Sequence, residues 1–451
     1  MSATSPDSKA LDIGQLLDGA QWSAFQKSVV ALVALALVFD GLDAQVLGLA
    51  IPALILDWNV ARADFAPIAA VGLIGMSIGT VLGGYVGDRI GRKWGLIFSV
   101  LVFGVATTAS AIVDTLWALG LCRAIVGIGL GGALPNSTAM IAEYTPARSR
   151  SVGIAVGMVT IPVGSMLGSL LAAAIIEDLG WRMLFAIGGV PPILLALSFI
   201  WLMPESPRYL AGRPQRRAEL MRTLARSGVQ TASDVQFSGA HSDGRGRTSL
   251  STLFGPGIRK DTMLTWLSFF MTMLALYTLV SWGPAMLAGE GFPLGFTGTA
   301  LASFGFGGIF GCLCSGWMLK YLGSRITKFL LAGGGALFAV GTGALFGESA
   351  PAQTTIMLTF GALGFSLAGM QNALYTLSAH LYATTARATG IGAALSVGRL
   401  GAVVSSFTGA WSIDLGGGAT FFWVIAAGLG LAAIAGASVE RPIPAVRALP
   451  G

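Results

Sequence analysis

The chain has 451 residues, of which 54% are hydrophobic and 11% are charged, and its formal net charge is +6. Soluble domains carry about 25% charged residues, so this composition excludes an ordinary soluble protein and indicates a membrane protein with many spanning helices. No basic run is interleaved with aromatic residues, which excludes nucleic acid as a partner. The sequence has no nucleophile–histidine–acid set, metal-ligand cluster or phosphate-binding loop, so we expect neither an enzyme nor a cofactor.

The first 27 residues are polar and lack a basic segment followed by an apolar core, so we expect a tail and not a cleavable signal. Apolar windows of about 20 residues then predict an all-α integral membrane protein with twelve transmembrane helices in two six-helix halves. The halves are 28–203 and 262–437, joined by a linker at 204–261 and followed by a tail at 438–451. The predicted helices are near 28–54, 66–87, 94–113, 115–140, 151–175, 182–203, 262–288, 298–319, 326–346, 353–378, 388–411 and 418–437. The linker is expected to begin with one basic amphipathic helix.

Two aspartates, Asp40 and Asp43, lie inside the otherwise apolar first helix. A carboxylate at membrane depth is costly, so such residues face the protein interior and mark an ion or substrate path. At positions i and i+3 both carboxyls project from one face of the helix. The pattern predicts a proton-coupling site, and the alternative is a structural pair locked to a buried arginine.

The placement of Lys and Arg predicts the orientation of the chain. Most of the basic residues fall in the tails, the linker and the connections after helices 2, 4, 8 and 10. The opposite connections hold only Arg62 and Arg182 among several acids. Both termini and the linker are therefore expected in the cytoplasm, as an even number of helices requires.

The two halves repeat one another. Residues 84–93, GYVGDRIGRK, match residues 316–325, GWMLKYLGSR, and at the same offset Pro52 corresponds to Pro284. A parallel six-helix repeat places a binding cavity between the halves near the middle of the membrane, and the halves rock to open it to either side.

The connection after helix 2 joins glycines, which permit a tight turn, to charged residues. Asp88 is placed to cap a helix or to pair across the interface between the halves. The segment resembles the signature loop of the major facilitator superfamily, which implies a gating role, and the alternative is a simple anchor of topology. In the second copy Lys320 stands where the first has Asp88, so the lock is expected to be asymmetric. The residues at this spacing are Gly84, Asp88, Arg89, Gly91 and Arg92.

Arg123, inside helix 4, and the Glu143-x-x-Pro146-x-Arg148 segment that ends this helix also resemble the superfamily, as does PESPRYL at 204–210. Within helix 1, the DGLD at 40–43 is similar to the hallmark of the aromatic acid:proton symporter family. Segments 129–136 and 387–402 are similar to that family as well. The resemblance covers essentially the whole chain. It implies import of a benzoate-like carboxylate with a proton, and it implies that the helix 1 acids and the arginines of helices 4 and 11 are required.

Depth along the helices tests which charged groups can meet. At about 1.5 Å per residue, Asp43 lies roughly 22 Å from the cytoplasmic start of helix 1 and Arg123 about 12 Å from the outer start of helix 4. These depths allow Arg123 to pair with either Asp43 or Asp40. Arg399 lies about 17 Å into helix 11, where its guanidinium suits a carboxylate in two parallel bonds. The alternative for Arg399 is pairing with backbone carbonyls or with a helix 1 acid.

Other polar and aromatic residues at membrane depth complete the predicted substrate site. Packing or lipid contact is the alternative for each ring, and Gln45 and Asn136 are further polar groups at this depth. The predicted substrate-binding residues are Arg123, Arg399, Phe39, Tyr277, Trp282, Phe304, Gln371, Asn372 and Tyr375.

The second repeat, in which 150–157 match 387–394, sets Glu143 opposite His380. The two could form a pH-sensitive cytoplasmic gate, because imidazole titrates near neutrality, and a structural histidine is the alternative. The predicted gating residues are Gly84, Asp88, Arg89, Gly91, Arg92, Glu143, Arg148, His380 and Arg387.

Together with the resemblance, these patterns predict a secondary transporter of a bacterial inner membrane, working as a monomer and driven by the proton gradient. The partners that the resemblance implies are a small aromatic carboxylate and protons, and the composition adds the lipid bilayer. A proton-coupled exporter of drugs or metabolites on the same fold is the alternative, and a sensor without transport is the alternative from another class.

Overall fold

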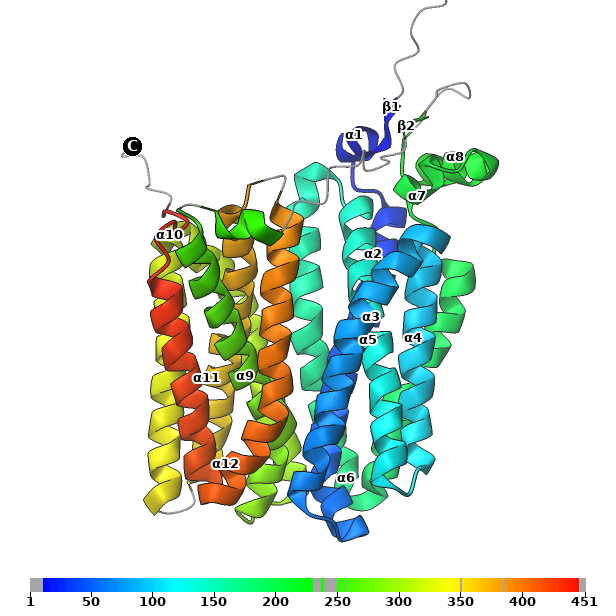
Figure 1. The fold of residues 1–451 in the computed structure, drawn as a ribbon. Coiled ribbons are helices and arrows are strands. Elements are labelled where there is room, and N and C mark those ends of the chain that lie inside the picture. The colour runs from blue at the N-terminus through cyan, green and yellow to red at the C-terminus, as the bar shows by residue number, and fades with distance from the viewer. Residues whose placement is uncertain are drawn as a thin grey trace, which may run out of the picture.

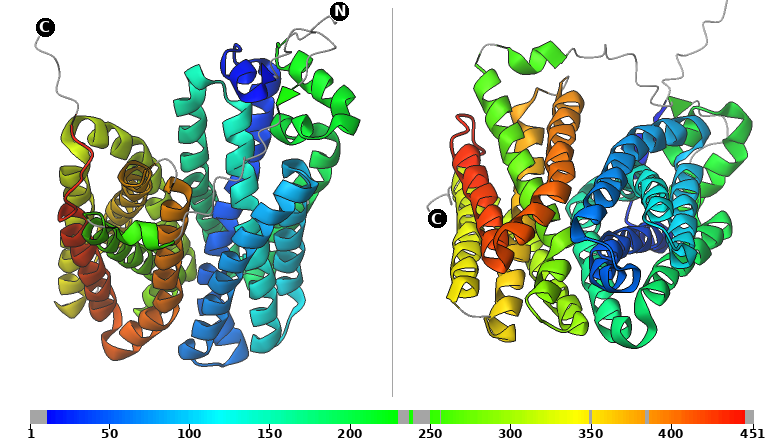
Figure 2. Two further views of the ribbon diagram at one scale, coloured as in Figure 1. Left: turned by 45° about the horizontal axis from the view of Figure 1, so that its top comes forward. Right: turned by 60° about the horizontal axis from the view of Figure 1, so that its bottom comes forward.

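The computed structural model describes residues 11–229, 237–238, 250–255, 257–348, 351–383 and 386–445. Its long helices form two bundles that lie side by side, one built from α2 to α6 and the other from α9 to α12 (Figure 1). The short helices α1 (Ile13–Asp18), α7 (Pro207–Ala211) and α8 (Arg217–Arg226) lie at one end of the first bundle, at the top of Figure 1. We call this end of the molecule the termini face and the other end the opposite face. The two views of Figure 2 keep the bundles apart in the same way.

The first bundle contains five long helices. They are α2 (Ala24–Trp58), α3 (Ala66–Ile90), α4 (Arg92–Ala109), α5 (Leu116–Tyr144) and α6 (Arg150–Leu202). The second bundle contains α9 (Arg259–Gly289), α10 (Leu294–Glu348), α11 (Gln353–Leu381) and α12 (Arg387–Ala437). Short 3-10 helices are η1 (Arg62–Phe65), η2 (Ser110–Ile112), η3 (Ala147–Ser149), η4 (Pro214–Arg216) and η5 (Leu250–Phe254).

Three of the long helices turn back at a glycine. Gly180 in α6, Gly323 in α10 and Gly417 in α12 have φ values of 74°, 75° and 59°, which a residue with a side chain rarely adopts. Each of these helices is therefore two spanning segments joined by a tight bend, at the positions where the sequence predicts breaks. Among the described residues, eight helices are long and apolar enough to cross a membrane. Each of the three bends adds one crossing and α11 adds another, so the helices are consistent with twelve crossings of the membrane.

The start of the first long helix is fixed by a capping box. The backbone N–H of Gln26 donates to the Ser23 hydroxyl at 3.2 Å, and the Ser23 N–H donates to the Gln26 side chain at 3.0 Å. Two of the backbone N–H groups that have no partner within the helix at its start are thereby satisfied. The cap sets where α2 enters the bundle, and so sets the depth of the two aspartates it carries.

The first part of the linker differs from the single amphipathic helix that the sequence predicts. The chain forms α7, then η4 and α8, because Pro214 has no backbone N–H and restricts the residue before it. Apolar side chains of these pieces pack with those of α1 in one small cluster: Ile13, Leu17, Leu210, Leu220 and Leu224. A two-residue parallel pairing joins β1 (Leu11–Asp12) to β2 (Phe237–Ser238). The predicted linker residues 230–236 and 239–249 lie outside the described residues.

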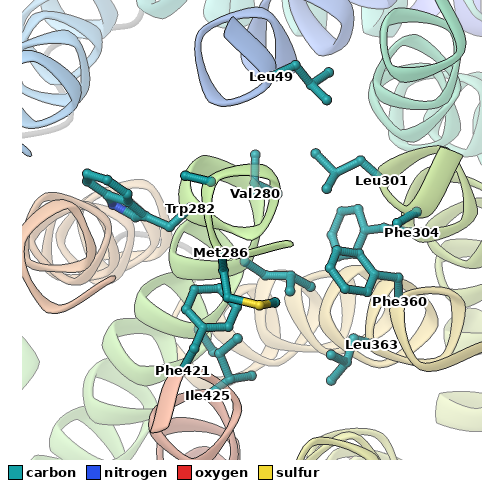
Figure 3. Close-up of a cluster of buried hydrophobic side chains, with 14 of the residues drawn as sticks. Leu49, Val280, Trp282, Met286, Leu301, Phe304, Phe360, Leu363, Phe421 and Ile425 are labelled. Carbon is teal, nitrogen blue, oxygen red and sulfur yellow. The ribbon is translucent and has the colours of Figure 1, made fainter. Parts of the chain in front are cut away.

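The largest hydrophobic cluster crosses from one bundle to the other. It takes Leu49 and Leu54 from α2 and joins them to residues of α9, α10 and α11, such as Val280 and Leu301. Figure 3 shows Leu49 facing Val280 and Leu301 across the gap between the bundles. A second cluster, which includes Leu37 and Phe103, belongs to the first bundle alone. Apolar burial therefore holds the two bundles together at the level of Leu49.

Candidate substrate site between the two bundles

A cavity of about 670 Å³ lies between the bundles, with residues of both in its lining. This volume falls in the range of typical small-molecule sites. The first bundle contributes two acids and two arginines, and the second contributes one arginine with several rings and amides. The predicted site residues in the lining are Asp40, Asp43, Arg123, Tyr277, Phe304, Gln371, Asn372, Tyr375 and Arg399.

The cavity opens toward the termini face. Its lining continues along the last turns of α5 to Thr145 and along the start of α6, where it includes Arg150. Arg150 pairs with Asp18 of α1, which lies at the termini face. The lining thus reaches the surface at this end of the two helices.

Three contacts close the cavity toward the opposite face. Arg62, between α2 and α3, pairs with Asp414 of α12 at 3.1 Å. The Glu177 carboxylate of α6 accepts a hydrogen bond of 2.7 Å from the backbone N–H of Gly295, in the first turn of α10. Between α2 and α9, a Cβ on Gly48 would lie only 2.6 Å from the Val280 carbonyl oxygen, so these backbones touch.

Asp43 belongs to a buried network within the first bundle. Its carboxylate accepts a hydrogen bond of 2.5 Å from the Thr107 hydroxyl and lies 3.7 Å from the Arg123 guanidinium. Arg123 also donates to Ser110 at 2.9 Å, and its guanidinium lies 5.0 Å from the centre of the Phe185 ring. The exposed fractions of Asp43 and Arg123 are 3% and 4%. A positive charge and a hydroxyl donor at these distances stabilise the ionised carboxylate.

Asp40 lies in a different environment. It is 5% exposed, and within the described residues its side chain forms neither an ion pair nor a hydrogen bond. It interacts electrostatically with Asp43 on the same helix and with Arg399 across the cavity. The two aspartates that the sequence places on one helix face thus have separate roles in the site: one is partnered and one is not.

Arg399 is the unpaired cation of the site. Its side chain is half-buried in the cavity lining and forms no ion pair with any described carboxylate. Tyr277 and Tyr375 lie near enough to interact with it electrostatically, and Gln371 lies beside Tyr375. The second bundle therefore presents a guanidinium, two phenols and an amide to the cavity, facing Asp40 from the first bundle.

Two aromatic residues of the predicted set are not brought to the cavity, which corrects the prediction for them. Trp282 is fully buried against Gly409 of α12, and Figure 3 shows its ring turned away from Phe304. It lies about 140° around the helix from Tyr277, which faces the cavity. Phe39 packs against the two hydrophobic clusters because it lies about 100° around α2 from Asp40.

Asn372 reaches the lining but is already bonded. Its amide donates to the Ser315 hydroxyl at 2.8 Å and to the Cys312 carbonyl at 3.3 Å, and so ties α11 to α10. Cys312 itself lines the cavity.

The loop after α3 closes on itself and on the linker. Asp88 pairs with Arg92 four residues on, and not across the interface, which was one of the two roles expected for it. Gly91 has a φ of 110°, and the Glu205 carboxylate lies directly against it and accepts a hydrogen bond of 3.0 Å from the Lys93 N–H. Burial raises the pKa of Glu205. This loop is therefore locked to the end of α6 within one bundle.

The remaining predicted gating residues do not form one cluster. Glu143 accepts hydrogen bonds from the Ser206 hydroxyl and the Arg208 N–H in its own bundle, while His380 is exposed at the end of α11 in the other. The predicted Glu143–His380 gate is therefore not assembled in this structure. Gly84 has open space around its Cα, and Arg89 lies over the Tyr85 ring. Arg148 and Arg387 are exposed.

Several residues of the site and of the contacts that close it have no distinguishing signal in the sequence. Thr107, Ser110 and Ser165 are small hydroxyl residues in apolar helices, where nothing in the sequence separates them from ordinary helix residues. The sequence places Arg62 and Asp414 on the same side of the membrane but gives no sign that they pair. Among the described residues, no group of His, Cys, Asp and Glu could hold a metal ion.

Known proteins resemble the chain over both bundles. The family described as the Major Facilitator Superfamily matches residues 33–347. The gallate transporter of Pseudomonas putida is 33% identical over 433 residues, covering 96% of this chain and 95% of that protein. The 4-hydroxybenzoate transporter PcaK of Pseudomonas putida is 33% identical over 413 residues, covering 90% and 91%. The inward-open xylose transporter XylE from E. coli superposes with a TM-score of 0.75 at 21% identity, over 92% and 97% of the two chains.

Proposed function

The chain belongs to the major facilitator superfamily of membrane transporters, and from this premise we propose that it imports a small aromatic carboxylate together with a proton. As a member of that superfamily it is a multi-pass transporter and not an enzyme. The substrate, the coupling ion and the direction are the proposal.

The unpaired Arg399 is the observation that carries the proposal. A guanidinium that lines a cavity and forms no ion pair with a described carboxylate is a ready partner for a carboxylate of a ligand, which it can bind through two parallel charge-assisted bonds. Arg123 is less suited to this task because Asp43 and Ser110 already engage it. We assign the substrate carboxylate to Arg399.

The ring of the substrate is proposed to lie among aromatic residues. Tyr277, Phe304 and Tyr375 line the cavity on the side of Arg399, and rings pack favourably against one another in offset or edge-on arrangements. The two curated relatives described above are named for gallate and 4-hydroxybenzoate, which are aromatic carboxylates.

The balance of buried charge supports proton coupling. Among the charged groups that line the cavity, Arg150 is already paired with Asp18 at the termini face. The charges of the remaining four, Asp40, Asp43, Arg123 and Arg399, cancel one another when all are ionised. A bound carboxylate adds one uncompensated negative charge, and moving such a charge at membrane depth is costly. One proton bound with the substrate restores neutrality, so we propose one proton for each singly charged acid.

Asp40 is proposed to bind that proton. The sequence pattern points to either aspartate, but in the structure Asp43 has a guanidinium and a hydroxyl donor that stabilise its ionised form. Asp40 has no such partner and interacts with Arg399, which the substrate would occupy. A carboxylate that competes with Asp40 for Arg399 weakens the support for the ionised Asp40 and so favours its protonation. This competition couples substrate and proton.

The orientation completes the proposal. The abundance of Lys and Arg near the termini face supports placing this face in the cytoplasm of a bacterial inner membrane. The cavity, open toward that face, then corresponds to a state that releases substrate inward. We propose that a monomer carries out the cycle, because each chain contains a complete cavity between its own halves.

Uptake by the purified protein in liposomes tests the proposal. Radiolabelled benzoate, 4-hydroxybenzoate and gallate are offered under an imposed pH gradient, with and without a protonophore. Accumulation that requires the gradient, together with alkalinisation of the external medium when substrate is added, is expected. Accumulation unaffected by the protonophore would overturn proton coupling. Outward transport of a cationic drug without uptake of any of the acids would replace the proposal by the exporter alternative.

A further inference from the structure

The amide of Gln45 is half-satisfied inside the cavity. Gln45 lies on α2, five residues after Asp40, lines the cavity and is 2% exposed. Its side-chain nitrogen donates to the Ser165 hydroxyl of α6, whereas its oxygen has no hydrogen-bond partner. A buried amide oxygen without a partner is uncommon and costly, so it needs an explanation.

Gln45 lies at the closed end of the cavity. Gly48, one turn further along α2, touches the backbone of α9 at Val280 and ends the open space in that direction. Asp40 lies about 7.5 Å along the helix axis toward the termini face. Gln45 therefore lies deeper in the cavity than Asp40.

The side chains of Asp43 and Gln45, which lie close together on α2, point toward different helices. Asp43 turns toward α4 and α5, where Thr107 and Arg123 hold it. Gln45 lies about 160° around the helix from Asp43 and turns toward α6, where Ser165 holds it. The Asp43 ion pair on one side therefore does not satisfy the Gln45 amide oxygen on the other.

We propose that Gln45 recognises a hydroxyl group on the ring of the substrate, so that the protein prefers hydroxylated aromatic acids to unsubstituted benzoate. The inference rests on the proposed function and refines it. A phenolic hydroxyl can donate to the amide oxygen or accept from the amide nitrogen, so it fits the amide whichever atom faces Ser165. The C–H of benzoate offers neither bond and would leave the amide unsatisfied. Sites built to bond a substrate hydroxyl discriminate strongly against analogues that lack it.

The test compares binding of benzoate with that of its hydroxylated forms. Purified protein in detergent is titrated calorimetrically with benzoate, 3-hydroxybenzoate, 4-hydroxybenzoate and 3,4,5-trihydroxybenzoate. The variant Gln45→Met keeps the length of the side chain but removes its hydrogen bonds, and Gln45→Leu serves if the first does not fold. Thr80→Val is the matched control, because the Thr80 hydroxyl lines the same cavity but bonds the Met76 carbonyl of its own helix.

The wild type is expected to bind at least one hydroxylated acid about tenfold more tightly than benzoate. Gln45→Met is expected to abolish this preference by weakening the hydroxylated acid, with little change for benzoate, and Thr80→Val is expected to preserve it. Equal loss for all acids, or an unchanged ratio, would overturn the role of Gln45 while leaving aromatic acid transport standing. Failure of the wild type to bind any of the acids would instead overturn the proposed function beneath it.

Discussion

Arg123 and Asp43 form an ion pair inside the first bundle, with the guanidinium nitrogen 3.7 Å from the carboxylate oxygen and both side chains almost fully buried. Arg399, the half-buried arginine that the second bundle contributes to the cavity, has no such partner among the described residues. The same residue type thus serves two purposes. One arginine neutralises an acid of the protein, and the other remains available to a ligand.

Removing the charge of Asp43 is expected to destabilise the protein. Asp43→Asn leaves the buried Arg123 without a counter-charge, and breaking a buried pair on one side costs about 3 to 5 kcal/mol. Thermal unfolding in detergent should show a clear loss of stability. The double variant Asp43→Asn/Arg123→Gln should recover part of it, because it removes the stranded charge. If the single variant unfolds like the wild type, the pair carries little energy.

Neutralising Asp40 is expected to uncouple transport from protons. Asp40→Asn cannot gain or lose the proton that we assign to this position, so uptake driven by a pH gradient should fall at least tenfold. Exchange of external for internal substrate needs no net proton movement and should persist. Liposomes loaded with unlabelled substrate measure the exchange, and the same liposomes under a gradient measure the driven uptake. Gradient-driven uptake at the wild-type rate would show that a group other than Asp40 binds the transported proton.

The planar guanidinium of Arg399, with its two parallel donors, is expected to contribute to substrate affinity as well as its charge. Arg399→Lys keeps a cation but loses the planar pair of donors, so the affinity for a carboxylate should fall about tenfold or more. Arg222→Lys, on exposed α8, is the matched control and should bind like the wild type. Calorimetric titration with 4-hydroxybenzoate checks both. Unchanged affinity in Arg399→Lys would show that the carboxylate binds elsewhere.

Weakening the closure at the opposite face is expected to shift the protein toward an outward-open state. Arg62 and Asp414 join the two bundles there, and exposed ion pairs of this kind contribute about 0.2 to 1 kcal/mol. The repulsive variant Arg62→Asp should therefore raise the outward-open population by several-fold, and Arg62→Asp/Asp414→Arg should restore it. Distances between spin labels on the two bundles report this population. An identical distance distribution in all three proteins would show that the pair does not hold the state.

The sequence allowed the class of fold, the repeat of two halves and the charged residues of the cavity to be predicted. Hydropathy and the matching segments 84–93 and 316–325 depend only on local composition, so they are readable without coordinates. The bends at Gly180 and Gly323 fall in predicted breaks for the same reason. The predicted linker helix failed at Pro214, where the geometry of one residue outweighed the amphipathic pattern around it.

Rotation about the helix axes limited the prediction of the site. Depth along the membrane left Arg123 free to pair with either aspartate, and only the packing of α4 and α5 against α2 selects Asp43. The rings of Phe39 and Trp282 have the right depth but face the packed side of their helices. The half-satisfied amide of Gln45 depends on Ser165, which is 120 residues away in the sequence.

The proposed coupling depends on electrical balance around the cavity, so the ratio of protons to substrate is its most direct test. Purified protein in liposomes is held at a series of membrane potentials and pH gradients, and the condition at which net flux of a singly charged aromatic acid vanishes is measured. One proton per acid predicts that zero flux depends on the pH gradient alone and does not shift with membrane potential. A shift with potential at constant pH gradient would show that net charge crosses with the substrate, and it would contradict the proposal that a single proton neutralises the loaded site.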